Sequence, residues 1–282
     1  MFTGLVVGVL LLLISVFMIF QTTCKVWGAE KPANATQQGI DVSSHQGKID
    51  WEQVKNSALA DYAIIRCGYG VNQTDKDDKY WDYNSSECER LGIPYGTYLY
   101  SGADTTAKAK SEAEHVVRLL QGKNLTYPIY YDMEADMLNQ LSSTQIGNIA
   151  KTFLNTMESY GYKNVAVYSN KYLFETKLTA SVFSDYPKWI AQHSNKCTYQ
   201  GSYHMWQYST QGVIPGISEK VDLNYKIGNW TYAGYSSAKK TVVVKPKATT
   251  IKSLRKSGKK AVKITYKTVS YTHLRAHETR RH

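Results

Sequence analysis

Strand-like and helix-like segments alternate five times between Gly39 and Leu178, and this alternation limits the fold more than any other feature of the chain. Three further strand-like segments follow, separated only by loops. The eight strand-like segments are 39–45, 62–70, 94–102, 127–134, 164–170, 186–192, 203–209 and 220–226. Because strands that alternate with helices form parallel sheets with right-handed crossovers, we expect an α/β fold. Eight strands in this order predict a barrel related to the TIM architecture and irregular in its last third.

Acidic side chains fall where several of these strands lie or end. Asp41 lies in the first strand, Asp132 and Glu134 end the fourth, and Asp222 lies in the eighth. The site of such barrels lies at the carboxyl ends of the strands, and the first and last strands become neighbours when the barrel closes. We therefore expect the four acids to meet at one mouth of the barrel.

Asp132 and Glu134 are two residues apart in a strand, so their side chains should point to the same side, about 6.6 Å apart. Two carboxyl groups at this distance perturb each other, so that one stays protonated while the other is ionised. Glycoside hydrolysis needs such a pair, with an acid for the leaving oxygen and an anion for the positive charge that develops on the sugar. The alternative is structural: either acid caps the next helix or pairs with Arg66.

Five motifs carry a more specific resemblance. In order along the chain they are "GIDVSSHQGKIDW", "YYDMEAD", "WIAQ", "MWQYS" and "VDLN". Together they resemble glycoside hydrolase family 25, the Chalaropsis-type lysozymes, from about Gly39 to Trp230.

The resemblance implies an irregular TIM-like (β/α)5(β)3 barrel and N-acetylmuramidase activity on peptidoglycan, without a metal or an organic cofactor. By resemblance, Glu134 is the general acid and Asp132 its partner carboxylate, with Asp41 and Asp222 as supporting acids. Hydrolysis assisted by the substrate's own N-acetyl group, direct nucleophilic attack and inversion all remain compatible with the D-x-E spacing.

Aromatic and polar side chains near strand ends are candidate sugar contacts. Each aromatic ring either stacks on a sugar or fills the barrel, and the residues are Tyr69, Tyr98, Tyr100, Tyr131, Trp189, Trp206 and Tyr208. Gln207 is a candidate hydrogen-bond partner for sugar. His45 either lines the cleft or bonds to backbone, and Arg66 is expected to pair with the acids.

Composition narrows the class of protein further. The chain has 23 tyrosines and only 6 phenylalanines, which suits half-wet, sugar-like interfaces. Its net charge of +11 is misleading, because residues 236–282 hold 14 Lys and Arg and one acid, whereas residues 1–235 carry a net charge of −2. The body therefore lacks a nucleic-acid-binding surface. The sequence contains no CxxC pair, so it does not predict a zinc site, and no G-x-S-x-G motif, so it does not predict a serine hydrolase. One disulfide bond among the four cysteines remains an alternative to free thiols.

The two ends of the chain are expected to lie outside the catalytic barrel. Residues 1–23 contain the apolar run Leu5–Phe20, which is either a membrane anchor or a signal peptide, and we favour the anchor. If the run is a signal peptide, Ala33–Ala35 is a candidate cleavage site. Residues 24–38 and 233–247 are expected linkers around the barrel at 39–232. Residues 248–268 alternate like a β-hairpin and resemble a truncated fibronectin III-like or Ig-like fragment. Residues 269–282 resemble a translated sequencing adapter.

The sequence thus predicts an exported, monomeric enzyme that acts on peptidoglycan glycan strands, with a basic tail suited to anionic wall polymers. Two alternatives belong beside it: a non-catalytic wall-binding protein that keeps the barrel as a sugar-binding surface, and a chitinase-like enzyme acting on N-acetylglucosamine polymers.

Overall fold

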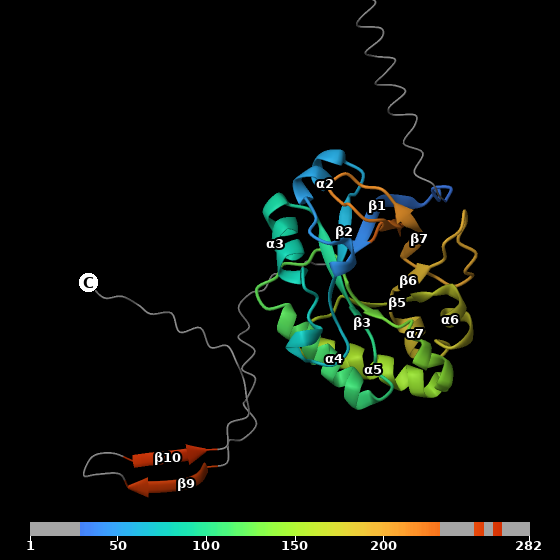
Figure 1. Cartoon of the computed structure of the whole chain (residues 1–282). Helices are drawn as coiled ribbons and strands as arrows, with labels where there is room; N and C mark the ends of the chain where they lie inside the picture. Colours follow the sequence, from blue (N-terminus) through green and yellow to red (C-terminus); the bar gives the residue numbers. More distant parts are fainter. Residues whose placement is uncertain (1–28, 232–250, 257–261, 267–282) are drawn as a thin grey trace, which may run out of the picture. The chain divides into compact units, whose positions relative to one another are not determined.

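The computed structural model describes residues 29–231, 251–256 and 262–266 (Figure 1). Within the first range, eight strands close a barrel in the order β1 to β8. The strands are β1 Ala35–Val42, β2 Tyr62–Tyr69, β3 Tyr95–Tyr100, β4 Ile129–Asp132, β5 Val165–Asn170, β6 Lys188–Ala191, β7 Met205–Gly212 and β8 Val221–Ile227. The predicted TIM-like barrel is confirmed.

Helices follow the first five strands and lie around the outside of the barrel (Figure 1). They are α2 Trp51–Ser57, α3 Trp81–Leu91, α4 Thr106–Leu119, α5 Ser143–Ser159, α6 Lys171–Thr176 and α7 Val182–Asp185, with short 3-10 helices η1 Ser44–Gln46, η2 Thr74–Lys76 and η3 Asp136–Gln140. In the described part of the chain no helix follows α7, so β7 and β8 are joined to their neighbours by loops alone.

One strand of the barrel runs opposite to the other seven. Neighbours from β1 to β7 are parallel, whereas β8 is antiparallel to both β7 and β1. A parallel neighbour needs a long crossover, which the loop 192–204 supplies between β6 and β7, but the short loop 213–220 permits only an antiparallel return. The start of β8 therefore lies beside the carboxyl ends of the other strands, and Asp222 is directly opposite Asp41 in the ladder. We call this end of the barrel the mouth.

The helix boundaries follow local capping chemistry. Asp50 accepts a hydrogen bond from the backbone N–H of Gln53 at the start of α2, as its position predicts. Ser142 and Gln145 form a capping box at the start of α5. Gly92 ends α3 in the left-handed region, with φ of 66°. Each helix then buries its apolar face against the outside of the barrel, as α5 does through Ile146, Ile149, Ala150, Phe153, Leu154 and Met157.

The base of the barrel interior is filled with side chains. Inward-pointing residues from β2, β4, β5, β6 and β7 pack there, among them Tyr62, Ile64, Tyr130, Ala166, Trp189 and Met205. A polar layer lies above them toward the mouth, so the structure has a solid floor and one functional end.

The ends of the chain differ in part from expectation. β1 begins at Ala35, inside the expected linker 24–38, because residues 35–38 pair with β8. A separate unit from Lys240 onward contains the antiparallel strands β9 Ile251–Lys256 and β10 Val262–Tyr266, which form a hairpin as the alternation predicts. Its assignment to a fibronectin III-like or Ig-like repeat stays a prediction. The apolar run Leu5–Phe20 and residues 269–282 lie outside the described residues.

Two further observations concern only the described residues. None of their helices has the length and hydropathy needed to cross a membrane. Cys67 and Cys88 are buried with free thiols, and Cys197 is a partly buried free thiol. Burial raises the pKa of the Cys67 thiol to about 12, which makes it a poor nucleophile.

Candidate active site

The predicted carboxylate pair lies at the mouth, at the end of β4. Asp132 is the last residue of the strand and is only 3% exposed, whereas Glu134 follows in the loop and is partly exposed. The loop between them is held by the backbone N–H of Met133, which donates to Tyr168 O, and by the Ser169 hydroxyl, which donates to Met133 O. Oδ1 of Asp132 is buried and has no hydrogen-bond partner in the described protein. A buried acceptor without a donor is costly, so a donor supplied by a ligand would stabilise it.

The other two acids face each other across the β1–β8 ladder. Oδ2 of Asp41 accepts hydrogen bonds from Nδ2 of Asn224 at 2.7 Å and from Nε2 of Gln207 at 3.0 Å. Gln207 Nε2 also lies 3.3 Å from Oδ2 of Asp222. The Asp222 carboxyl is in turn hydrogen-bonded to Asp41. Asp41 thus accepts from two amide donors, whereas Asp222 is reached only by the longer Gln207 contact, and this difference favours Asp41 as the anion of the pair.

Gln207 connects these acids to two further side chains. Because its Nε2 faces carboxylates, its Oε1 must accept, and it lies 3.0 Å from the Tyr168 hydroxyl and 2.9 Å from Nε2 of His193. His193 therefore donates through Nε2–H. Asn224 is fixed in the same way, since its Oδ1 accepts from the indole N–H of Trp189 at 2.8 Å. The network fixes the orientation of both amides.

Burial and mutual repulsion perturb all four acids. Burial first, then the charges of Glu134 and Asp41, raises the pKa of Asp132 well above its usual value, against a smaller opposing effect of Arg66. Burial, and then Asp41, also raises the pKa of Glu134, while His193 and the Tyr168 hydroxyl act in the opposite direction.

The pKa values of Asp41 and Asp222, which face each other across the β1–β8 ladder, are also raised. Burial, followed by the charge of Asp41, raises the pKa of Asp222 to about 9, and burial raises the pKa of Asp41. Closely spaced acids titrate as a group, so the mouth retains protons at neutral pH. A site that holds both a proton donor and an anion can catalyse acid-assisted cleavage of a glycosidic bond.

Comparison with known proteins decides the family. The model of glycosyl hydrolases family 25 matches residues 40–217. The chain belongs to family 25. It is therefore a glycoside hydrolase.

The chain is similar to other proteins in sequence and in fold. The autolytic lysozyme of Clostridium acetobutylicum is 30% identical over 188 residues, which cover 66% of this chain and 55% of that protein. The modular autolysin LytC of Streptococcus pneumoniae is 33% identical with a TM-score of 0.62, over 67% of this chain and 46% of LytC. A family 25 glycosyl hydrolase of Bacillus anthracis, 21% identical, shares the fold with a TM-score of 0.62 over 72% of this chain and 94% of its own. The chain thus spans about half the length of the first two.

The structural alternatives for the carboxylate pair do not apply to this family 25 enzyme. The cap of η3 is Ala135 and that of α5 is Ser142, so neither Asp132 nor Glu134 caps a helix. The predicted pairing of Arg66 with the mouth acids is wrong. Its guanidinium binds Asp78 at 2.8 Å and the Ser44 hydroxyl at 2.9 Å, because the loop after β2 folds back beside β1.

Three predicted sugar contacts are wrong because their rings do not reach solvent. Tyr131 points outward, stacks on Phe153 and donates to buried Glu112. Trp206 also points outward and is 0% exposed. Trp189 points inward but belongs to the packed floor, 1% exposed.

The remaining candidates stay at the mouth or its rim. The pKa of Tyr98 and that of Tyr100 are raised, first by burial and then by nearby mouth acids, which places both rings beside the site. Tyr69 is 44% exposed at the end of β2. Tyr208 lines a rim pocket, but its ring is 3% exposed and stacks on Tyr225 outside the barrel, so it offers no open face to a sugar. Gln207 acts within the acid network rather than as a free sugar contact, and His45 is exposed in η1 with its backbone N–H bonded to Ser43.

Three members of the acid network, Asn224, His193 and Tyr168, were not among the predicted site residues. Asn224 is two residues after Asp222, so the strand period alone places both on one face. His193 follows the "WIAQ" motif at the carboxyl end of β6, a position that points to the mouth in this fold. Tyr168 carried no signal, since its strand is apolar on both faces. Among the described residues, no group of three His, Cys, Asp or Glu is arranged to hold a metal ion.

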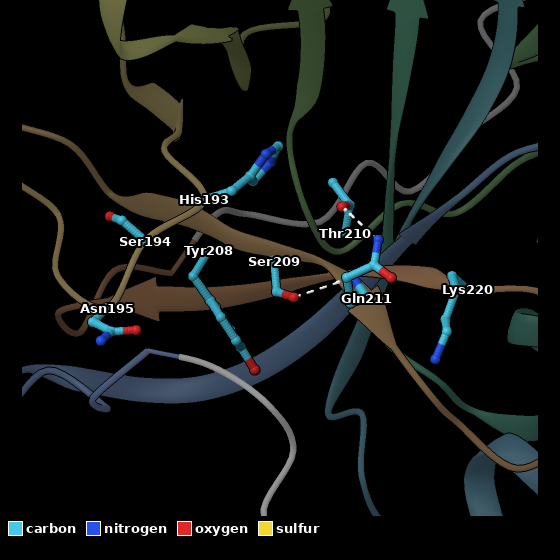
Figure 2. Close-up of a pocket in the computed structure, with 8 residues that line it drawn as sticks. All are labelled: His193, Ser194, Asn195, Tyr208, Ser209, Thr210, Gln211 and Lys220. Carbon is cyan, nitrogen blue, oxygen red and sulfur yellow. Dashed lines mark hydrogen bonds between the residues drawn. The ribbon is translucent and has the colours of Figure 1, made fainter.

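A pocket of about 450 Å³ opens at the rim next to this network. We call it the rim groove, and Figure 2 shows its side chains around the end of β7. Its lining residues are His193, Ser194, Asn195, Tyr208, Ser209, Thr210, Gln211 and Lys220. His193 belongs both to the groove and, through Gln207, to the acid network.

Proposed function

We propose that this glycoside hydrolase cleaves the β-1,4 bond between N-acetylmuramic acid and N-acetylglucosamine in peptidoglycan, with Glu134 as general acid and Asp132 as partner carboxylate. The observation that carries the proposal is the buried Asp132 Oδ1, which has no partner in the described protein, beside the partly exposed Glu134. Family membership and the lysozyme and autolysin relatives support the same activity.

Glu134 is suited to donate the proton. It lies at the opening of the mouth, where a glycosidic oxygen can reach it, and its raised pKa keeps the carboxyl protonated at higher pH than an ordinary glutamate. Protonation of the leaving oxygen and breakage of the glycosidic bond proceed together, and the sugar ring develops positive charge.

Asp132 is suited to balance that charge. In the free enzyme burial favours its neutral form, because no donor reaches Oδ1. The N–H of an acetamido group would supply the missing donor and favour the anion. The carboxylate would then orient the acetamido oxygen, which bonds to the anomeric carbon as the protonated leaving group departs, and water would displace that oxygen in a second step, which is the substrate-assisted route. This route predicts retention of configuration, measurable as the first anomer formed in an NMR time course.

Asp41, Asp222 and Gln207 support the pair without touching the reacting bond. The single proton shared by the two aspartates keeps one negative charge near Glu134 rather than two. That charge raises the pKa of Glu134. Replacement of Asp41 by Asn should therefore reduce turnover less than replacement of either member of the pair.

The test compares Glu134→Gln and Asp132→Asn with the wild type in a turbidity assay on purified cell walls. Each change is nearly isosteric, so both variants should stay folded while turnover falls by a factor of about 10² or more. Near-normal turnover of Glu134→Gln would exclude it as the acid and would favour the wall-binding alternative.

Mass spectrometry of the released reducing ends tests the substrate. Reducing N-acetylmuramic acid is expected. Reducing N-acetylglucosamine from chitin would instead establish the chitinase-like alternative.

The place of action follows from the substrate. Peptidoglycan lies outside the cytoplasmic membrane, and export through the apolar run Leu5–Phe20, as anchor or cleaved signal, is part of the proposal. We further propose a monomeric catalytic barrel whose basic residues 236–282 add weak, salt-sensitive attraction to anionic wall polymers. The acidic body is not proposed to bind nucleic acid.

A further inference from the structure

The rim groove differs chemically from the mouth beside it. The mouth carries four acids, whereas the groove is lined by side-chain hydroxyls and amides and by the two basic residues His193 and Lys220 (Figure 2). No acid lines it. A ligand part that carries negative charge is therefore repelled by the mouth and accepted by the groove.

Lys220 is the strongest feature of this surface. It is exposed, it immediately precedes β8, and within the described residues no carboxylate lies in ion-pair distance of its amine. Its backbone is fixed, because Nε2 of Gln46 donates to Lys220 O at 3.1 Å. The result is an exposed amine that extends from a fixed point of the backbone at the rim and can pair with a ligand.

The groove has no open aromatic face for a sugar. Its one aromatic residue, Tyr208, is 3% exposed and stacked on Tyr225 at 4.3 Å between centroids. Asn195 and Gln211 present side-chain amides, which match the donors and acceptors of a peptide backbone. The chemistry of the lining thus favours an anionic peptide over a second glycan segment.

The groove is also directly adjacent to the mouth. Its inner end is His193, which is joined through Gln207 to Asp41, by contacts of 2.9 Å and 3.0 Å. Glu134 also faces this network, because Tyr168, whose hydroxyl acts on the Glu134 carboxyl, donates to Gln207 at 3.0 Å. Muramic acid differs from N-acetylglucosamine in carrying a lactyl ether, and in peptidoglycan that lactyl group bears a peptide.

We propose that the rim groove binds the peptide attached to the muramic acid unit, with Lys220 pairing with a peptide carboxylate. The proposal rests on the function proposed above and adds the substituent that the enzyme recognises. Lys220 is then a specificity-determining residue rather than a catalytic one. A free lactyl carboxylate has the same charge, and the experiment separates the two sources.

The experiment uses the full chain with Lys220→Met, and with Lys151→Met as a matched control on the exposed face of α5. Three soluble glycans of equal length are compared: one with its peptides, one whose peptides an amidase has removed to leave free lactyl carboxylates, and one whose peptide carboxylates are converted to amides. The measured quantity is the ratio of kcat/KM values between substrates.

Lys220→Met should reduce the preference for peptide-bearing over peptide-free glycan about two- to fivefold, the range of an exposed ion pair. The loss should lie in KM, should shrink in high salt and should be absent on the amidated glycan. Lys151→Met should match the wild type.

Three results would overturn the proposal. An unchanged preference would show that Lys220 does not bind the peptide. An equal loss on peptide-free glycan would assign the site to the lactyl carboxylate, and an undiminished loss on the amidated glycan would exclude charge pairing. Failure of the proposed function itself is distinct, because the wild type would then cleave none of the three glycans.

Discussion

Replacement of Asp222 by Asn should stabilise this enzyme while impairing it. The carboxyl of Asp222 has a pKa of about 9 in the folded protein against an ordinary value of 3.8, because burial and the charge of Asp41 oppose its ionisation. In the unfolded chain the same group ionises near its ordinary value. Between these two values the folded state binds a proton that the unfolded state has released, so the free energy of unfolding falls as pH rises.

The size of the effect follows from the same interval. At about 1.4 kcal/mol per pH unit, the interval from 3.8 to about 9 sets a ceiling of roughly 7 kcal/mol on the stability lost by pH 9. The realised gain is smaller, because Asp41 and Asp222 share one proton and an isolated Asp41 would still be a buried anion. We expect Asp222→Asn to gain about 1–3 kcal/mol at pH 8, as is common when an active-site strain is removed.

Thermal melting at pH 4, 6 and 8 tests this reasoning. The difference between Asp222→Asn and the wild type should be smallest at pH 4, where the unfolded carboxyl is only partly ionised, and should grow toward pH 8. Asp75→Asn, on the exposed 3-10 helix η2, serves as the control and should show no such trend. A variant that is no more stable than the wild type at pH 8, or a gap independent of pH, would refute a shared proton at the ladder.

Three further predictions concern other parts of the chain. Glu112→Gln should lower the free energy of unfolding by about 1–3 kcal/mol, measured by denaturant unfolding. Buried Glu112 accepts hydrogen bonds from Tyr131, Ser101 and the Gly102 N–H, whereas an amide offers only one acceptor oxygen. An unchanged denaturant midpoint would contradict this. Deletion of residues 248–282 should leave melting and the hydrolysis of soluble glycan unchanged and reduce only salt-sensitive wall binding, since the barrel is a separate unit; loss of the fold would show that the boundary is misplaced. Expression with the native leader should place the enzyme in the membrane fraction, whereas a soluble form that begins near Thr36 would reveal a cleaved signal peptide.

The barrel fold and the four acids at its mouth could be predicted from the sequence because both depend on strong periodic patterns. Strand and helix alternation fixes the barrel, and the two-residue period places Asp132 with Glu134 and Asp222 with Asn224. The acids are also conspicuous, since charged residues rarely end a buried strand.

The direction in which each side chain points, into the barrel or toward the helices, was harder to predict in strands that are buried on both sides. In β4 every residue is buried, so Tyr130 and Tyr131 look equivalent in sequence although one points into the barrel and the other toward α5. Similarly, nothing local reveals that Gln207 turns its amide nitrogen to Asp41 and Asp222, because that orientation depends on three other strands. Hydrogen-bond networks of this kind are set by tertiary contacts.

The reversed direction of β8 has a consequence for how the barrel can be connected to other sequence. Because β8 runs back to the base, the last residues of the barrel return to its first ones: the backbone N–H of Gly228 donates to Asn34 O at 2.8 Å, and the Thr36 hydroxyl donates to Gly228 O at 3.0 Å. With entry and exit in direct contact, the barrel is topologically close to a ring. It can be inserted into a loop of another protein, or circularly permuted by a short peptide joining its two ends, without stretching any strand. Both junctions lie at the base, so either rearrangement leaves every loop of the mouth in its native connection.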